Sequence, residues 1–232
     1  MNGLWVCVVS LFVAFLSLSS VQAAGMKPET SVVILEESDG EASINVKNTE
    51  SFPALLYSEI LPIEGDNERL VVLTPPVARV ESGESQAVRF LLQTKEPLKV
   101  QRLRRVIFES ILPKNNSGKS QVVMNVRQNL PVIINPKGLP LDKEPWRHLK
   151  WSSTGEKLQV SNPSAYVVRL DQVIKLNAGN LALRLPRSYL LPGDVVTLDA
   201  PYEMLKAATA VVISPATVYG YLVDQYTAPL EP

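Results

Sequence analysis

The chain has 232 residues, of which 46% are hydrophobic and 20% are charged, a balance typical of a globular protein. Its 23 Lys and Arg residues equal its 23 Asp and Glu residues, which argues against a nucleic-acid-binding protein, because such proteins usually carry a basic excess. The length suits one or two domains, and the 18 prolines favour many short strands joined by turns.

The first 23 residues are predicted to be a cleavable export signal. Residues 4–18 form an apolar run that is too short for a comfortable membrane span. Cleavage after Ala23 would leave Val21 and Ala23 at the positions where compact side chains are expected. An uncleaved anchor is the alternative, since no Lys or Arg precedes the apolar run. Cleavage would also remove Cys7, the only cysteine, so the exported protein would have no disulfide and would depend on its core.

Residues 24–136 are predicted to form a first domain of short strands. Strand candidates separated by turn residues lie at 31–35, 42–46, 53–60, 70–73, 86–92, 105–112 and 121–134. A series of about seven short strands with regular turns is typical of an immunoglobulin-like sandwich. No helical period competes with this pattern.

The proline-rich segment 136–140 is predicted to separate this domain from a second, smaller one at residues 137–232. Strand candidates resume at 157–161, 166–176, 181–185, 195–198, 208–213 and 218–226. The predicted fold class is therefore all-β, with two sandwiches held by a short connection.

The sequence contains little that could support catalysis. His148 is the only histidine, and without a cysteine a metal site or a nucleophile–base pair would need unusual partners. Phosphate-binding and nucleophile-elbow motifs are also missing from the sequence. We therefore expect His148 to lie on the surface or between the domains, and we expect no enzyme activity, metal or cofactor.

Three arginines, Arg102, Arg104 and Arg105, gather at the start of one strand candidate. Neighbouring side chains of a strand point to opposite faces, so either Arg104 or Arg105 must enter a packing layer or a cleft between the domains. Because unpaired buried charge is scarce, this cluster is a candidate for binding an anion or for an ion pair between domains. The alternative is a solvated basic face.

The last strand candidate of the first domain has an unusual apolar row. Val122, Met124 and Val126 share one face of residues 120–126, at a place that should be the edge of a sheet. An apolar edge normally invites pairing with another chain. The row can face the domain's own core or a partner, and the residues alone leave both interpretations open.

Residues 73–84, Leu-Thr-Pro-Pro-Val-Ala-Arg-Val-Glu-Ser-Gly-Glu, followed by Ala-Val-Arg-Phe at 87–90, resemble the periplasmic chaperones of the chaperone–usher pilus pathway, the PapD-like family. The resemblance continues at 44–48, in Arg-Val-Ile-Phe-Glu-Ser-Ile-Leu-Pro at 105–113, and in Leu-Gln-Val-Ser-Asn-Pro-Ser-Ala-Tyr-Val-Val at 158–168. It covers nearly the whole chain after the signal.

The resemblance implies two immunoglobulin-like domains set in an L or boomerang shape. It implies that the protein binds pilus subunits in the periplasm and delivers them to an outer-membrane usher. The chaperone lends its last first-domain strand to complete the subunit, and Val122, Met124 and Val126 would fill the subunit's groove. An exposed apolar edge also makes self-capping between free copies plausible.

The family's usual anchor for the subunit's terminal carboxylate is not preserved. The resemblance places Val32 and Pro131 where the family has a basic pair. A buried carboxylate without a partner is costly, so we expect another basic residue in the cleft, with Arg102, Arg105 and Arg127 as candidates.

The ion network that joins the domains in the family is altered as well. Asn135 replaces an arginine before the boundary proline, and Asp224 resembles an acidic member late in the second domain. The resemblance thus suggests an ion pair between Arg102 and Asp224, with two separate solvated charges as the alternative. A secreted immunoglobulin-like structural or adhesive surface protein is the second functional hypothesis.

Overall fold

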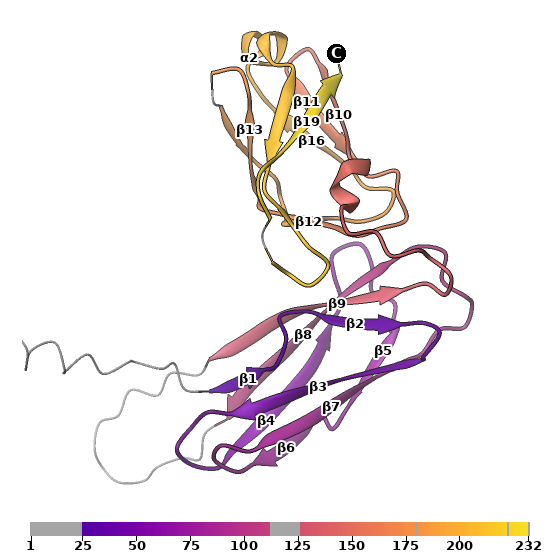
Figure 1. The fold of residues 1–232 in the computed structure, drawn as a ribbon, viewed down its shortest axis with the longest axis vertical. Helices are drawn as coiled ribbons and strands as arrows, with labels where there is room; N and C mark the ends of the chain where they lie inside the picture. The colour runs from indigo at the N-terminus through magenta and orange to yellow at the C-terminus, as the bar shows by residue number, and fades with distance from the viewer. Residues whose placement is uncertain (1–24, 112–125, 180, 222, 232) are drawn as a thin grey trace, which may run out of the picture.

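The structure is a computed structural model that describes residues 25–111, 126–179, 181–221 and 223–231. Two lobes built mainly of strands meet at an angle and give the molecule the shape of an L (Figure 1). The predicted all-β fold with two immunoglobulin-like sandwiches in an L is therefore confirmed. No helix in these ranges is long and apolar enough to cross a membrane.

The first domain consists of two sheets, whose orders among the described residues are β1-β3-β7-β5 and β2-β9-β8-β4-β6. The first sheet contains β1 (Met26–Pro28), β3 (Glu41–Asn48), β5 (Val71–Thr74) and β7 (Ser85–Leu92), and the second contains β2 (Val33–Glu36), β4 (Ala54–Leu61), β6 (Val77–Val80), β8 (Arg102–Ile111) and β9 (Arg127–Asn135). The N-terminal segment changes sheets, because β1 pairs with β3 whereas β2 pairs in parallel with β9.

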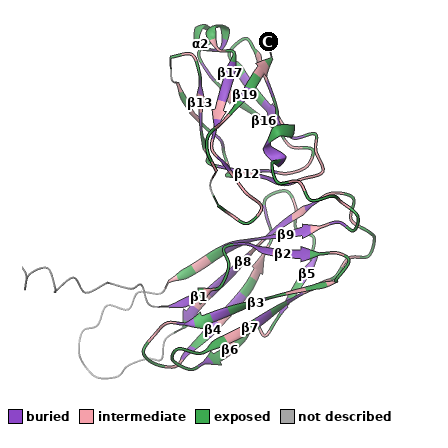
Figure 2. Ribbon diagram, viewed as in Figure 1, coloured by how far each residue is buried: buried purple, intermediate pink, exposed green. Residues whose placement is uncertain are grey.

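Alternation along the strands builds the core of this domain. Ile44 and Val46 of β3, and Val88 and Phe90 of β7, are buried between exposed or half-buried neighbours, as Figure 2 shows by its changing colours along the strands. Phe108 of β8 packs in the same core from the other sheet. Each such side chain stabilises the fold by roughly 1.5–3 kcal/mol, so a core of this size can hold the domain without a disulfide.

The second domain has the sheet orders β14-β13-β17-β19-β10-β11-β16 and β15-β12-β18 in the described part of the chain. Its strands are β10 (Lys150–Thr154), β11 (Lys157–Ser161), β12 (Val168–Leu170), β13 (Val173–Leu176), β14 (Ala182–Arg184), β15 (Tyr189–Leu190), β16 (Val195–Asp199), β17 (Ala210–Ile213), β18 (Pro215–Ala216) and β19 (Tyr226–Glu231). Two short helices, η1 (Pro145–His148) and α2 (Tyr202–Ala207), were not predicted, because four to six residues are too few to show a helical period.

An apolar cluster joins the two domains. Val32, Leu103 and Ile133 of the first domain are buried together with Val167 of the second. Gln101 adds hydrogen bonds across the same contact. Its backbone N–H donates to the Ala165 carbonyl at 2.8 Å, and its side-chain oxygen accepts from the Val167 N–H at 2.7 Å.

The side chain of Gln101 also donates to Oδ1 of Asn135 at 2.8 Å. Asn135 stands where the family resemblance expects an arginine, but its side-chain hydrogen bonds, with Gln101 and Glu36, lie within the first domain. The amide of Gln101 crosses to the second domain, where a charge was expected. Amide hydrogen bonds are not screened by salt in the way that exposed ion pairs are.

Candidate functional site

Part of strand β9 has no neighbour on one side among the described residues. β9 pairs with β8 from Arg127 to Ile134, but with β2 only from Val132 to Asn135. The chain before β2 belongs to β1 in the other sheet and therefore cannot extend the pairing. Residues 127–131 thus form an open edge, with backbone N–H and C=O groups at 127–130 and a C=O group alone at Pro131, and such an edge is a template for a strand from another chain.

The predicted apolar row leads directly into this open edge. Val122 and Met124 lie outside the described residues. Val126 is half-buried and directly precedes β9. A Cβ atom added to Gly25 would lie 3.5 Å from the Cβ of Val126, so this side chain borders the N-terminal segment just before β1.

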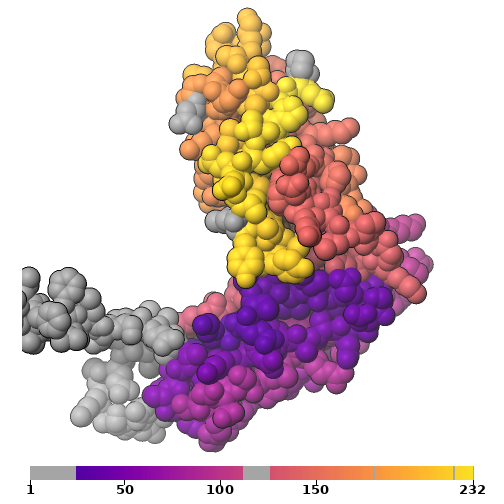
Figure 3. Space-filling view, viewed as in Figure 1, coloured from indigo at the N-terminus to yellow at the C-terminus, as the bar shows by residue number. Residues whose placement is uncertain are grey.

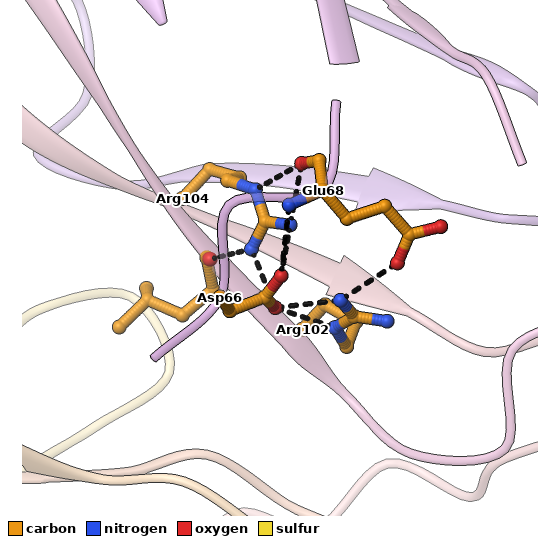
Figure 4. A network of polar contacts seen from close by, with 5 residues as sticks. Asp66, Glu68, Arg102 and Arg104 are labelled. Atoms are coloured by element: carbon orange, nitrogen blue, oxygen red, sulfur yellow. Dashed lines mark hydrogen bonds and ion pairs between the residues drawn. The ribbon is translucent and has the colours of Figure 1, made fainter. Parts of the chain in front are cut away.

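Arg104 enters the end of the sandwich and is only 1% exposed. Its guanidinium donates to both carboxylate oxygens of Asp66, at 2.7 and 2.8 Å, and to the backbone carbonyl of Glu68 at 2.8 Å (Figure 4). Between Arg104 and Arg105, Arg104 is therefore the one that enters the packing layer. The arrangement fixes the loop that carries Asp66 against β8.

Arg102 contributes to the same network. It donates to Asp66 at 2.8 Å and to the Glu68 carboxylate at 2.9 Å. Burial alone would raise the pKa of Asp66, but hydrogen bonds from Arg104 and then Arg102 outweigh burial and hold that pKa below its ordinary value.

The predicted ion pair between Arg102 and Asp224 is not formed. Asp224 is exposed, and Arg102 pairs instead with two carboxylates of its own domain. The physical reason is proximity, because the loop with Asp66 and Glu68 lies beside the start of β8. With its charge compensated there, Arg102 is also a poor candidate for an anion site.

Arg127 lies away from the domain junction. It is opposite Glu109 in the register of β8 and β9, and it donates to that carboxylate at 2.6 and 2.9 Å. Its side chain is exposed. The structure therefore does not bring Arg127 into the cleft, since three residues of β9 separate it from Pro131.

Arg105 is the predicted basic residue that does reach the cleft between the domains. It lines a cavity of about 220 Å³ together with Leu103 and Pro131 of the first domain and Arg169 and Tyr189 of the second. Arg105 is opposite Pro131 in the register of β8 and β9. A basic side chain thus stands one strand away from the position where the resemblance expects it.

Arg169, which the sequence analysis did not identify, faces the same cavity from β12. Its Nη1 atom is buried and has no hydrogen-bond partner among the described residues. Burial, and then repulsion from Arg105, lower the pKa of Arg169. Burial likewise lowers the pKa of Arg105, whose guanidinium donates to the side-chain and backbone oxygens of Asn129.

Neither of these two arginines belongs to an ion pair within the described ranges. Asp171 also lines the cavity, but its carboxylate accepts from the Val173 N–H at 3.0 Å. Two partly buried cations that form no ion pair within the described ranges make a site for an anion, and a carboxylate matches the planar donors of a guanidinium.

Val32, at the other expected anchor position, is buried in the apolar contact between the domains. His148 lies on the surface, with Nε2 2.7 Å from the Asp142 carboxylate and its ring stacked on Tyr166. The described residues contain no group of three or more His, Cys, Asp or Glu side chains that could hold a metal ion.

Comparison with known families gives two matches that together span most of the chain. The family described as "Pili and flagellar-assembly chaperone, PapD N-terminal domain" matches residues 25–140. The family described as "Pili assembly chaperone PapD, C-terminal domain" matches residues 144–227.

Individual relatives agree with these matches. An uncharacterized fimbrial chaperone of Escherichia coli K12, YhcA, is 40% identical over 95% of this chain and 97% of its own. The probable fimbrial chaperone LpfB of Escherichia coli O157:H7 is 26% identical over 71% of this chain and 73% of its own.

Two solved structures are similar in fold at 19% identity. The Salmonella enterica SafA pilin in complex with the SafB chaperone matches with a TM-score of 0.72, over 91% of this chain and 99% of the matched one. The Escherichia coli chaperone DraB matches with a TM-score of 0.71, over 90% of this chain and 100% of its own.

Proposed function

The chain belongs to the PapD-like family of pilus-assembly chaperones, which are not enzymes, and from this premise we propose that it binds, folds and caps pilus subunits in the periplasm and delivers them to an outer-membrane usher. The predicted signal at residues 1–23, which lies outside the described residues, would direct its export.

The open edge of β9 at residues 127–131 is the observation that carries this proposal. A subunit strand can pair with this edge and continue along residues 120–126. The side chains of Val122, Met124 and Val126 would then fill the groove of the subunit. Burial of three such side chains contributes roughly 5–9 kcal/mol before the costs of association.

We assign the terminal carboxylate of the subunit to Arg105 and Arg169. Both arginines line the cavity beside Pro131, and a carboxylate there would pair with two cations that form no ion pair within the described residues. Charge-assisted hydrogen bonds to an arginine also fix the register of the bound strand. The arginine pair thereby replaces the anchor that Val32 and Pro131 cannot provide.

Co-expression with a pilin encoded beside it tests the proposal. The native protein is expected to yield a soluble 1:1 complex from periplasm. The Arg105→Gln/Arg169→Gln variant is expected to weaken the complex at least thirtyfold, because loss of a buried charge partner costs about 2–5 kcal/mol. Titration of the purified pilin complex by competition measures this ratio.

Arg79→Gln is the matched control, since Arg79 is exposed and pairs with Glu81 in the first domain. It should bind as the native protein does. Failure of the native protein to recover any pilin would contradict the chaperone function and favour an adhesive surface protein. Equal binding by all three proteins would support the chaperone function but contradict the assignment of the subunit carboxylate to Arg105 and Arg169.

A further inference from the structure

A groove of about 720 Å³ lies beside the open edge of β9. It is lined by residues 27–32 of the N-terminal segment, by residues 128–130 of β9, and by Tyr219 and Tyr221 of the second domain. In Figure 3 the yellow tip of the second domain reaches down to the indigo surface of the first. The groove thus has walls from both domains and a floor that includes the open edge.

The turn that carries the two tyrosines has a defined shape. The Thr217 N–H donates to the Tyr221 carbonyl at 2.8 Å, and the Gly220 N–H donates to the Thr217 carbonyl at 2.9 Å. Gly220 has a φ of +85°, a left-handed conformation that favours glycine.

The same turn is fixed against the first domain. The hydroxyl of Ser31 donates to the Tyr219 carbonyl at 3.0 Å. A Cβ atom on Gly220 would lie 2.8 Å from the Ser31 hydroxyl oxygen and 3.0 Å from Cγ2 of Val32, so a larger residue could not approach as closely. The close contact holds the tyrosines beside the groove.

Both tyrosines are unusually exposed for large aromatic residues. Tyr219 is 56% exposed and Tyr221 is 72% exposed. Exposed aromatic side chains gathered at a groove are characteristic of protein interfaces, because they combine a large apolar area with a hydroxyl that can hydrogen-bond at the rim.

We infer that Tyr219 and Tyr221 bind the pilus-subunit strand that pairs with the open edge of β9, close to the end of that strand. This inference rests on the proposed function. A strand added to a sheet runs about 4.8 Å from its neighbour, and residues 128–130 of the open edge line this groove, so a strand paired there would run along it. Gly220 also lines the Arg105 and Arg169 cavity, so the tyrosines lie next to the proposed carboxylate site.

Photo-crosslinking tests the inference in the full chain. p-Benzoyl-phenylalanine replaces Tyr221 in one variant and Tyr202 in the control, which is an exposed tyrosine of α2 at the far end of the second domain (Figure 1). Each variant is co-expressed with the pilin and irradiated. We expect at least tenfold more pilin adduct from position 221, with the adduct mapped by mass spectrometry to the terminal strand of the pilin.

Capture of the pilin before irradiation separates the two claims. If both variants capture the pilin and position 221 gives no more adduct than position 202, or gives an adduct elsewhere on the pilin, the tyrosine contact is overturned while the chaperone function stands. If the native protein captures no pilin, the proposed function and this inference both fail.

Discussion

Asp66→Asn is expected to lower the free energy of unfolding by about 3–5 kcal/mol at neutral pH. The substitution removes the carboxylate that pairs with Arg104, whose side chain is only 1% exposed, and leaves a buried cation without a counter-charge. Urea unfolding followed by circular dichroism measures the change.

Glu68→Gln provides the matched control, because the side chain of Glu68 is 55% exposed and its carboxylate pairs with Arg102 rather than with the buried Arg104. An exposed ion pair contributes about 0–1 kcal/mol, so the free energy of unfolding of the control should remain close to that of the native protein. Equal losses in Asp66→Asn and Glu68→Gln would contradict the central role assigned to the buried pair.

Acidification should reduce the difference in the free energy of unfolding between the native protein and Asp66→Asn. The pKa of folded Asp66 lies below its ordinary value, so its stabilising contribution is present above that ordinary value and is lost as the pH falls through the lowered folded value. Unfolding curves measured from pH 7 to strongly acidic conditions should therefore converge.

Met124→Arg/Val126→Arg is expected to reduce pilin affinity at least a hundredfold. Two side chains that would each contribute roughly 1.5–3 kcal/mol in the subunit groove are replaced by cations, which are costly to bury. Quantitative recovery of the pilin complex from periplasm, with purified complexes titrated where they form, measures the loss.

The control for this variant is Val195→Arg/Met204→Arg, which alters two exposed apolar residues of the second domain. It introduces the same charge away from β9 and should leave pilin recovery unchanged. Full recovery of the pilin with Met124→Arg/Val126→Arg would contradict the proposal that Met124 and Val126 fill the groove of the subunit.

Much of the fold could be predicted from the sequence because each sheet has one buried face. Ile44 and Val46 alternate with polar residues, and so do Val88 and Phe90, as a half-buried strand requires. Such a pattern does not reveal how strands are ordered in the sheets. The change of sheet between β1 and β2, which leaves part of β9 open, depends on pairing over a long sequence separation.

The candidate site was predicted only in part. Alternation along the strand predicted that Arg104 and Arg105 point to opposite faces and that one of them enters a packing layer or a cleft. In the structure Arg104 lies in the packing layer, whereas Arg105 lines the cavity between the domains. The partner of Arg102 could not be foreseen, since the loop with Asp66 is held to β8 by tertiary contacts. Arg169 lies between two buried residues of a strand, but only the packing of the two domains turns it toward Arg105.

Amide hydrogen exchange of the native protein, free and in complex with a pilin, tests the strand-lending claim most directly. Pairing with a subunit strand would engage backbone groups of residues 120–131, including those that lie at the open edge of β9 in the free protein. We predict that amides of residues 127–130 that face the open edge exchange at least tenfold more slowly in the complex, whereas those of exposed α2 do not change. Unchanged exchange throughout residues 120–131 in a stable 1:1 complex would contradict strand lending at this edge.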